Sequence, residues 1–409
     1  AVTKLAGALM QALGETNTAI VVQGNGKRKR FTQQPDGAWA SAPGTYQTLT
    51  VEADGSAALR DKFGTTQFFN RFGRLTRIED RNSNLLTIGY DEAGVIASAT
   101  AASGRTLTFT KGADGRIASV TDPLGRRFQY QYDANGYMIR AVDPAGGETL
   151  YGYHADGNLH TVVDPRGNTA ITLTYDGEDR VTQEVLADGA TYRFEYLSDT
   201  QTRVTNPRGF QTLYTFNATG QPLEIRDPLG RTTRSTWDAN YNRLSHTDGN
   251  GHTTTFTYDA NGNLLTETDA LAQVTTYTYE PIYNQVTSET DAEGNVTRFE
   301  YDARGNLTKL IDAEANETVF AYDAQGWLTS TTDPRGNTTT YGLDASGNLT
   351  SITDALGNTA TLTYDAVGNL TSITDAEGRT TTFEYDGLNR RTKITDAFGA
   401  ETTFAYDPN

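Results

Sequence analysis

The sequence predicts an all-β protein made of β-hairpins that pair edge to edge into one long, curved antiparallel sheet, a segment of a spiral or hollow shell. The composition favours turns and strands, with 40 glycines and 22 tyrosines but only two methionines. An aromatic residue recurs about every 21 residues over most of the chain, and each interval carries two turn signals. A repeat of this length indicates a linear array of one supersecondary unit.

The repeat is defined by the residue four places before a turn glycine, here called the head. Seventeen heads lie between residues 69 and 406, and 15 of them are aromatic. We expect their rings to share one face of the sheet and form a stabilising ladder. The tyrosine heads taken as structural sites of the repeat are Tyr90, Tyr132, Tyr153, Tyr175, Tyr258, Tyr301, Tyr322, Tyr364, Tyr385 and Tyr406.

Each unit contains two turns. The first follows the head, as in "YDANGNL" from Tyr258 to Leu264, and the second is an Asp-X-X-Gly tract such as "DPLG" at 122–125. Aspartate can cap such a turn with its side chain, and glycine accepts the positive φ that a tight turn requires. The repeated aspartates are therefore interpreted as turn caps and not as catalytic carboxylates, which would need one distinctive site.

Two short strands complete the unit. In "RTTTFEYD", residues 379–386, Phe383 and Tyr385 share one face and Thr382 and Glu384 share the other. In "NLTSITD", residues 369–375, Leu370 and Ile373 are three apart, which predicts a bulge or a twist, or a Leu370 that covers the turn. Thirty-four strands at roughly 4.8 Å make a ribbon on the order of 160 Å long, and sheet twist must curl it around a hollow interior.

The chain divides into three parts. Residues 1–20 form a short helical or linker segment, 21–68 form degenerate hairpins that start the sheet, and 69–409 hold about 17 repeats of 21 residues. One helical face of the first part would collect its apolar residues, and Gly14 would end the helix. That face comprises Val2, Leu5, Ala6, Leu9, Met10 and Leu13.

The composition excludes several classes of function. A net charge of −17 repels phosphate backbones, so we expect no nucleic-acid partner, and the basic run at 27–30 is interpreted as solvated. No stretch of about 20 apolar residues is present, so no membrane insertion is expected. Without cysteine the chain has no disulfides and no thiolate chemistry.

The motif "YDANGNL", the "DPLGR" turn, the 21-residue spacing and the lead-in "FFNRFGRLTRIEDRNSNLLTIGYDEAG" at 68–94 resemble those of RHS/YD-repeat proteins. That family includes bacterial RHS toxins, the C components of insecticidal toxin complexes and teneurins. The resemblance implies YD-repeat hairpins wound into a hollow shell, which in bacterial members encloses a C-terminal toxin domain. Family shells carry a self-cleaving "DPxGL" site, whereas each Asp-Pro-X-Gly here is followed by another residue, such as Arg126.

Other candidate sites are weak on sequence grounds, and we predict no enzyme activity, catalytic residue, cofactor or metal site. "DANGN" at 259–263 lacks the spacing of an EF-hand loop. His246 and His252 flank one turn and could face each other, but no third metal ligand stands nearby. Trp237 and Trp327 interrupt the local pattern, and Trp327, next to Gly326, is the candidate for an exposed ligand contact.

Two functions fit this pattern. The first is a non-enzymatic structural segment of a secreted or cell-surface bacterial shell that encapsulates or presents a polypeptide cargo such as a toxin domain. The second is a cell-surface adhesion or self-association module, with glycans as the ligand class. An unpaired edge strand also predicts concentration-dependent self-association.

Overall fold

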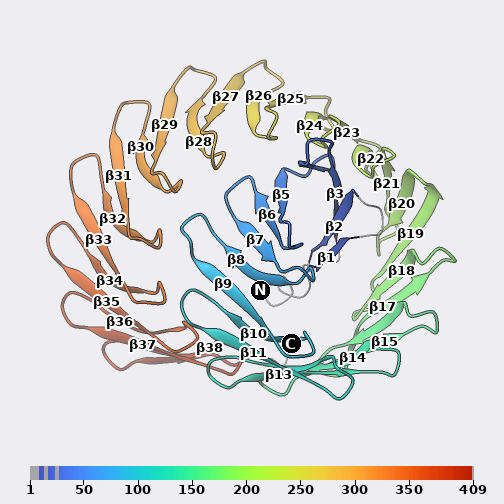
Figure 1. The fold of residues 1–409 in the computed structure, drawn as a ribbon, viewed down its shortest axis with the longest axis horizontal. Helices are drawn as coiled ribbons and strands as arrows, with labels where there is room; N and C mark the ends of the chain where they lie inside the picture. Colours follow the sequence, from blue (N-terminus) through green and yellow to red (C-terminus); the bar gives the residue numbers. More distant parts are fainter. Residues whose placement is uncertain (1–8, 13–16, 24–26, 408–409) are drawn as a thin grey trace.

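The computed structural model describes residues 9–12, 17–23 and 27–407, and all regular secondary structure in these ranges is β. Its 39 strands form one sheet, in which each strand pairs antiparallel with its neighbours in the sequence. The predicted fold class is confirmed. The sheet winds as a spiral, with the first strands inside the ring that the later strands form (Figure 1).

We call β1–β22 the inner lap and β23–β39 the outer lap. The inner lap comprises β1 (Leu9–Ala12), β2 (Thr18–Val22), β3 (Arg28–Gln33), β4 (Trp39–Ser41), β5 (Gln47–Val51), β6 (Ala57–Asp61), β7 (Thr66–Phe69), β8 (Leu75–Glu79), β9 (Leu85–Tyr90), β10 (Ile96–Thr100), β11 (Thr106–Lys111), β12 (Ile117–Thr121), β13 (Arg127–Tyr132), β14 (Met138–Val142), β15 (Glu148–Tyr153), β16 (Leu159–Val163), β17 (Thr169–Tyr175), β18 (Val181–Leu186), β19 (Thr191–Ser198), β20 (Gln201–Thr205), β21 (Gln211–Phe216) and β22 (Pro222–Arg226).

The outer lap comprises β23 (Thr232–Trp237), β24 (Arg243–Thr247), β25 (Thr253–Tyr258), β26 (Leu264–Thr268), β27 (Val274–Tyr279), β28 (Val286–Thr290), β29 (Val296–Tyr301), β30 (Leu307–Ile311), β31 (Glu317–Tyr322), β32 (Leu328–Thr332), β33 (Thr338–Leu343), β34 (Leu349–Thr353), β35 (Thr359–Tyr364), β36 (Leu370–Thr374), β37 (Thr380–Tyr385), β38 (Arg391–Thr395) and β39 (Glu401–Thr403).

Of the alternatives predicted for Leu370, the structure shows the bulge. Thr363 pairs with Ser372 and Tyr364 pairs with Leu370, so Thr371 is the extra residue on its strand. The same register shift precedes Tyr258 and Tyr385. A bulge bends its strand and increases the local twist. From β7–β8 to β37–β38 each hairpin has a register shift at or next to its head, and β16–β17 has one more, so the bends accumulate along the ribbon.

The helix predicted near the N-terminus is wrong where the chain is described. Leu9–Ala12 forms β1 and pairs with β2, whose outer edge would otherwise leave a row of unpaired peptide groups. Those hydrogen bonds outweigh the weak helical pattern. Residues 1–8 and 13–16, which include Val2, Leu5, Ala6 and Leu13, lie outside the described residues.

The hydrophobic core sits at the start of the spiral. Val21, Phe31 and Leu59 are fully buried, and the buried residues of their cluster extend to Ala99, with the partly buried Phe109 packed against them. Among the described residues, no apolar side chain after Val120 is buried. The outer lap is therefore a single-layer sheet, half-exposed on both faces, and not the side of a solid globule.

Candidate functional site: the repeat wall and its seam

Most head residues anchor each hairpin to the preceding one. The hydroxyl group of Tyr258 donates a hydrogen bond of 3.0 Å to the carbonyl oxygen of Arg243, 15 residues earlier. Trp237 makes the equivalent bond with its indole Nε1–H, to Pro222. An aromatic side chain that carries a hydroxyl or N–H group suits this half-buried position, because the ring packs on the sheet while the polar group reaches a backbone carbonyl oxygen. The same bond is made by Tyr90, Tyr132, Tyr153, Tyr175, Tyr196, Tyr279, Tyr301, Tyr385 and Tyr406.

Tyr322 and Tyr364 have half-buried rings but no hydroxyl bond of this kind in the described structure. Partial burial raises the pKa of Tyr258 and of Tyr364 above the ordinary value, because the phenolate form loses solvation. Burial raises the pKa of Tyr90, Tyr132, Tyr153, Tyr175, Tyr301 and Tyr322 in the same way.

The turn aspartates are occupied by their own turns. In the turn of Asp344, one carboxylate oxygen accepts the backbone N–H groups of Ser346 and Asn348, and the other accepts the side-chain amide of Asn348. These donors lower the pKa of Asp344, the side-chain amide of Asn348 having the largest effect. The same arrangement lowers the pKa of Asp291, Asp312, Asp333 and Asp354. Both carboxylate oxygens therefore accept hydrogen bonds within the turn, as expected of a turn cap. A general acid or base would need a carboxylate oxygen that is free to exchange a proton with a substrate.

The two laps meet along a seam, where second turns of the inner lap contact head turns of the outer lap. Lys62 Nζ donates to the carbonyl oxygens of Asn261 and Gly262 and to Asn263 Oδ1, at 3.1, 3.3 and 2.9 Å. In return, Asn284 Nδ2 donates to the carbonyl oxygen of Lys62 at 2.8 Å. These bonds join residues about 200 positions apart in the sequence and fix the outer lap on the inner one.

Further along the spiral, side chains of inner-lap second turns again donate to carbonyl oxygens of outer-lap head turns. Asn84 and Arg126, each directly after the fourth residue of a second turn, donate to the carbonyl oxygens of Gln325 and Gly387 at 2.9 and 3.2 Å. Further on, Arg166 pairs with Asp407, whose carboxylate lies 3.3 Å away. Each of these side chains also bonds within its own turn or lies beside an acidic group. The seam is therefore held both by ion pairs and by hydrogen bonds from side chains to backbone carbonyl oxygens.

Close packing reinforces this polar seam. The ring of Tyr283 lies against Gly64 of the inner lap and Gly305 of the outer lap, so near that a Cβ on either glycine would lie 2.7 or 2.8 Å from a ring carbon. Arg60 stacks over the same ring at 5.6 Å. Both glycines have positive φ, and both are therefore required for backbone conformation as well as for space.

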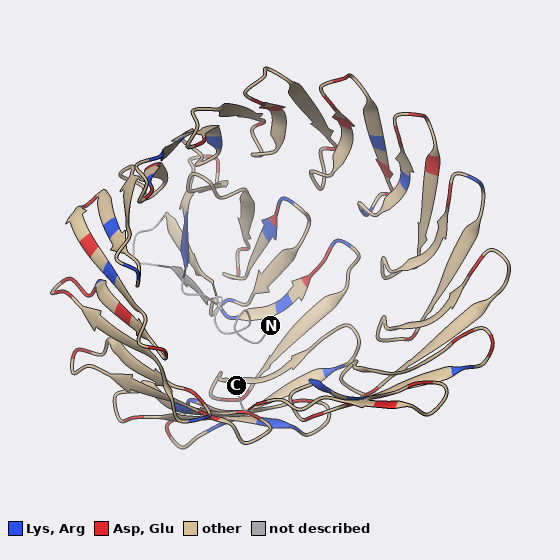
Figure 2. Ribbon diagram, turned by 180° about the vertical axis from the view of Figure 1, so that it is seen from behind, with Lys and Arg blue, Asp and Glu red and all other residues tan. Residues whose placement is uncertain are grey.

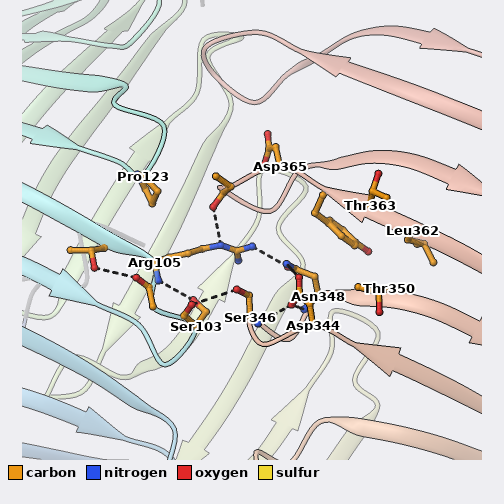
Figure 3. A pocket seen from close by; sticks show the side chains of 14 residues that line it. Ser103, Arg105, Pro123, Asp344, Ser346, Asn348, Thr350, Leu362, Thr363 and Asp365 are labelled. Atoms are coloured by element: carbon orange, nitrogen blue, oxygen red, sulfur yellow. Dashed lines mark hydrogen bonds between the residues drawn. The ribbon is translucent and has the colours of Figure 1, made fainter.

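One cavity of about 640 Å³ opens across the seam (Figure 3). Arg105 bridges it, donating from Nη2 to Asn348 Oδ1 and from Nε to the carbonyl oxygen of Ala366, both at 3.2 Å. Ser346 Oγ donates to the carbonyl oxygen of Ser103 at 3.4 Å. The carboxylates that line the cavity belong to turn caps, so the polar groups of this cavity hold the laps together.

Charge is divided unequally along the chain. Residues 1–226, which hold the inner lap, contain 23 Lys and Arg against 24 Asp and Glu, a net −1, so the total of −17 leaves −16 for residues 227–409, which hold the outer lap. Acidic residues recur in the loops around the ring (Figure 2). The cations of the inner lap therefore face an acidic outer lap at the seam, and this arrangement favours the wound state.

The structure corrects the interpretations of the histidines and of Trp327. His246 pairs with Thr254 across its hairpin, while His252 lies in the turn beside Asp248, so the two imidazoles do not face each other. The close pair is instead His154 and His160, with ring centroids 4.2 Å apart. Trp327 is half-buried, and its indole packs on Gly347 of the next head turn.

Two absences among the described residues bear on what the wall can hold. No group of three or more His, Asp or Glu side chains in this part of the chain could hold a metal ion. None of its segments is a helix long and apolar enough to cross a membrane. The arrangement of the described side chains is that of a wall, whose polar groups pair with one another.

The geometry defines a class of protein: a β-hairpin repeat protein wound into a spiral wall. Comparison with known proteins then gives the family. The model of the RHS Repeat matches nine segments, at 113–148, 153–191, 196–232, 216–255, 237–274, 258–281, 283–317, 322–359 and 364–401. The chain belongs to the RHS repeat family.

Solved structures agree on the fold. The chain resembles the structures of a Photorhabdus luminescens Tc holotoxin pore with a substitution in TccC3, of TcdB2-TccC3 without its hypervariable C-terminal region, and of TcdB2-TccC3, with TM-scores of 0.54, 0.55 and 0.53. Each match has 16% sequence identity and covers 93% of this chain but 26% of the other. The chain thus spans about a quarter of the length of those proteins. No curated protein matched it in sequence.

The seam residues were missed by sequence reasoning. Two features of the sequence relate to them, and the first is not specific. Non-glycine residues occupy the positive-φ turn position at Tyr241, Asn284 and Asn389, which lie at the seam, but also at Ala272 and Ala315, for which the described structure gives no seam contact. Lys62 and Arg81 occupy the second position of inner-lap second turns, where most other second turns have proline or alanine. Neither feature shows which turns come together, because that depends on the pitch of the spiral.

Proposed function

We propose that this chain is a non-enzymatic structural segment of an RHS β-shell that encloses or presents a polypeptide, such as a toxin domain. The observation that carries the proposal is the single-layer outer lap held on the inner lap by the seam. A sheet without an apolar core of its own, fixed at its edge, is suited to bound a space. The similar solved structures belong to Tc toxin assemblies, which supports a polypeptide as the partner.

The proposal can be stated for the position of the last described residues. Asp407 lies against Arg166 of the inner lap. A polypeptide joined there would start next to β39, the last described strand, and beside the inner lap. A secreted or cell-surface bacterial setting is part of the same proposal.

Protease protection tests the proposal. A protease-sensitive reporter peptide is fused after Asn409, and its cleavage rate is compared with that of the free reporter. We expect slower cleavage in the fusion and a return towards the free rate when Lys62→Ala and Tyr283→Ala open the seam. Cleavage of the fused reporter at the free rate, in a protein whose circular dichroism shows an intact sheet, would overturn the proposal.

A further inference from the structure

Two histidines lie close together in the hairpin β15–β16 of the inner lap. His154 begins the head turn 154–158, and His160 is the second residue of β16. Their ring centroids are 4.2 Å apart, and both side chains are half-buried, so a solvated ion can reach them. The chain has four histidines and no cysteine, which makes this pair its strongest candidate for binding a transition metal.

Neither imidazole is needed to build the hairpin that carries it. Eleven of the 17 head turns begin with an aspartate that can cap the turn, whereas this turn begins with His154. Asp156 takes over part of that role and accepts the N–H group of Asn158 at 3.1 Å. His160 is the extra residue of the bulge at Tyr153 and has no partner in the strand register. Both side chains are therefore available for another role.

Both imidazoles direct a nitrogen toward one main-chain oxygen. The carbonyl oxygen of Leu173, in β17, lies 3.0 Å from His160 Nδ1 and 3.4 Å from His154 Nε2. Zinc binds nitrogen at about 2.0–2.1 Å and oxygen at about 2.0–2.2 Å, so two such ligands are about 2.9 Å apart at a right angle and about 3.4 Å apart at the tetrahedral angle. The two measured N···O distances fall in this range. The three atoms are thus spaced as ligands of one metal ion.

The surroundings hold the pair in place and favour a cation. The ring of Tyr175 packs edge-on against His154, with centroids 5.9 Å apart, and its hydroxyl group donates to the carbonyl oxygen of Leu159 at 2.6 Å. Residues 153–181, which contain the whole site, hold five Asp and Glu against two Arg. An excess of carboxylates raises the local concentration of cations. Because all these groups belong to two consecutive hairpins, the site needs no contact between the laps.

We propose that His154, His160 and the carbonyl oxygen of Leu173 bind one divalent transition-metal ion, with water completing its coordination. Each ring gives the lone pair of the nitrogen nearest Leu173 to the metal and keeps its proton on the other nitrogen. Imidazole suits copper, nickel and zinc, and Cu²⁺ binds most tightly in this series, whereas Ca²⁺ and Mg²⁺ prefer oxygen ligands. The third ligand is main-chain, so the site differs from the sets of three side chains that are absent from the described residues.

The bound ion has a definite structural effect. It ties the head turn 154–158 of one hairpin to β17, which belongs to the next hairpin. A ligand that binds only the folded state stabilises the part of the structure that it holds. Metal binding therefore strengthens this part of the wall, whether or not the wall encloses a polypeptide.

Metal ions alone serve as the probes. The chlorides of Cu²⁺, Ni²⁺, Zn²⁺ and Ca²⁺ are titrated into the intact chain, without a histidine tag, and binding is measured by calorimetry. We expect one Cu²⁺ per chain, weaker binding of Ni²⁺ and Zn²⁺, and no binding of Ca²⁺ at the same concentrations. Electron paramagnetic resonance of the Cu²⁺ complex should show two nitrogen ligands, and hydrogen exchange of the amides in β15–β17 should slow when Cu²⁺ is added.

Variants that restore the residues of other repeats locate the site without disturbing the fold. His160→Thr gives the bulge the residue that stands at Thr308 and Thr371, and His154→Asp gives the turn its usual first residue. His160→Thr should weaken Cu²⁺ binding at least about tenfold, because even the loss of an outer-shell partner of a metal ligand typically costs that much. The two substitutions together should also remove the two-nitrogen signal.

The other two histidines provide the matched control. His246 lies within 3.3 Å of Ser235 Oγ, and His252 lies within 3.2 Å of Asp248 Oδ2, so neither faces the proposed site. His246→Asn with His252→Asn removes the same number of imidazoles and should leave the Cu²⁺ affinity unchanged.

Three results would rule out the proposal. The first is an unchanged Cu²⁺ affinity in the double variant of His154 and His160 when its circular dichroism shows an intact sheet. The second is an equal loss of affinity in the control pair. The third is a Cu²⁺ complex with fewer than two nitrogen ligands that leaves the exchange of β15–β17 unchanged, since the two imidazoles would then only hydrogen-bond to the carbonyl oxygen of Leu173.

Discussion

Replacing a head tyrosine by phenylalanine tests the anchoring of one hairpin on the preceding one. Tyr258→Phe keeps the half-buried ring and removes only the hydroxyl that donates to the carbonyl oxygen of Arg243 at 3.0 Å. A protein hydrogen bond contributes about 1 kcal/mol net, so the local opening equilibrium should rise about fivefold. Tyr364→Phe is the matched control, because its hydroxyl makes no bond to a carbonyl in the described structure.

Native-state hydrogen exchange is the appropriate assay for this pair of variants. A long repeat array need not unfold in one step, so a single global free energy of unfolding is poorly defined. Exchange rates of the β24–β25 amides report the opening of that hairpin directly. Faster exchange in Tyr258→Phe, with Tyr364→Phe within a few tenths of a kcal/mol of the parent protein, is the expected result. Equal effects of the two variants would refute the role assigned to the hydroxyl.

Three further outcomes are expected. Ala315 adopts φ 65°, so Ala315→Gly should stabilise its turn by about 1 kcal/mol. Gly357 adopts φ 86° and has no atom near an added Cβ, so Gly357→Ala should destabilise its turn by a similar amount through backbone strain alone. Hydrogen exchange of the amides in the flanking strands measures both effects. Lys62→Met removes the ammonium group that donates to three acceptors of the outer lap. Chemical cross-linking between the region of residue 62 and the region of residue 263 should therefore fall, while the far-ultraviolet dichroism stays that of a β-sheet. Unchanged cross-linking would show that Lys62 does not hold the seam. Burial raises the pKa of many head tyrosines, so the folded state favours the protonated phenol. The resulting contribution to folding stability is complete below the unfolded pKa of about 10 and is lost as the pH rises through the folded pKa. Tyrosinate absorbance and the loss of the β-sheet dichroism signal should therefore rise together above about pH 10.

The sequence by itself determined the hairpins, because their causes are local. Asp-X-X-Gly tracts specify the turns, alternation specifies the strand faces, and the three-residue spacing of Leu370 and Ile373 indicated the bulge that β36 contains. The family was also accessible, since its motif recurs within every unit. The assignment of the tyrosine heads as structural sites stays a prediction, to which their hydroxyl bonds now add a mechanism.

The tertiary structure alone decided how the ribbon closes on itself. Lys62 meets Asn263, and Arg126 meets Asn389, because twist accumulated over many bulged hairpins brings distant turns together. No short window of sequence encodes that sum. The same long-range geometry replaced the predicted helix by β1 and placed the core at the start of the spiral. Local chemistry thus fixes each hairpin, and only the accumulated curvature fixes which hairpins become neighbours.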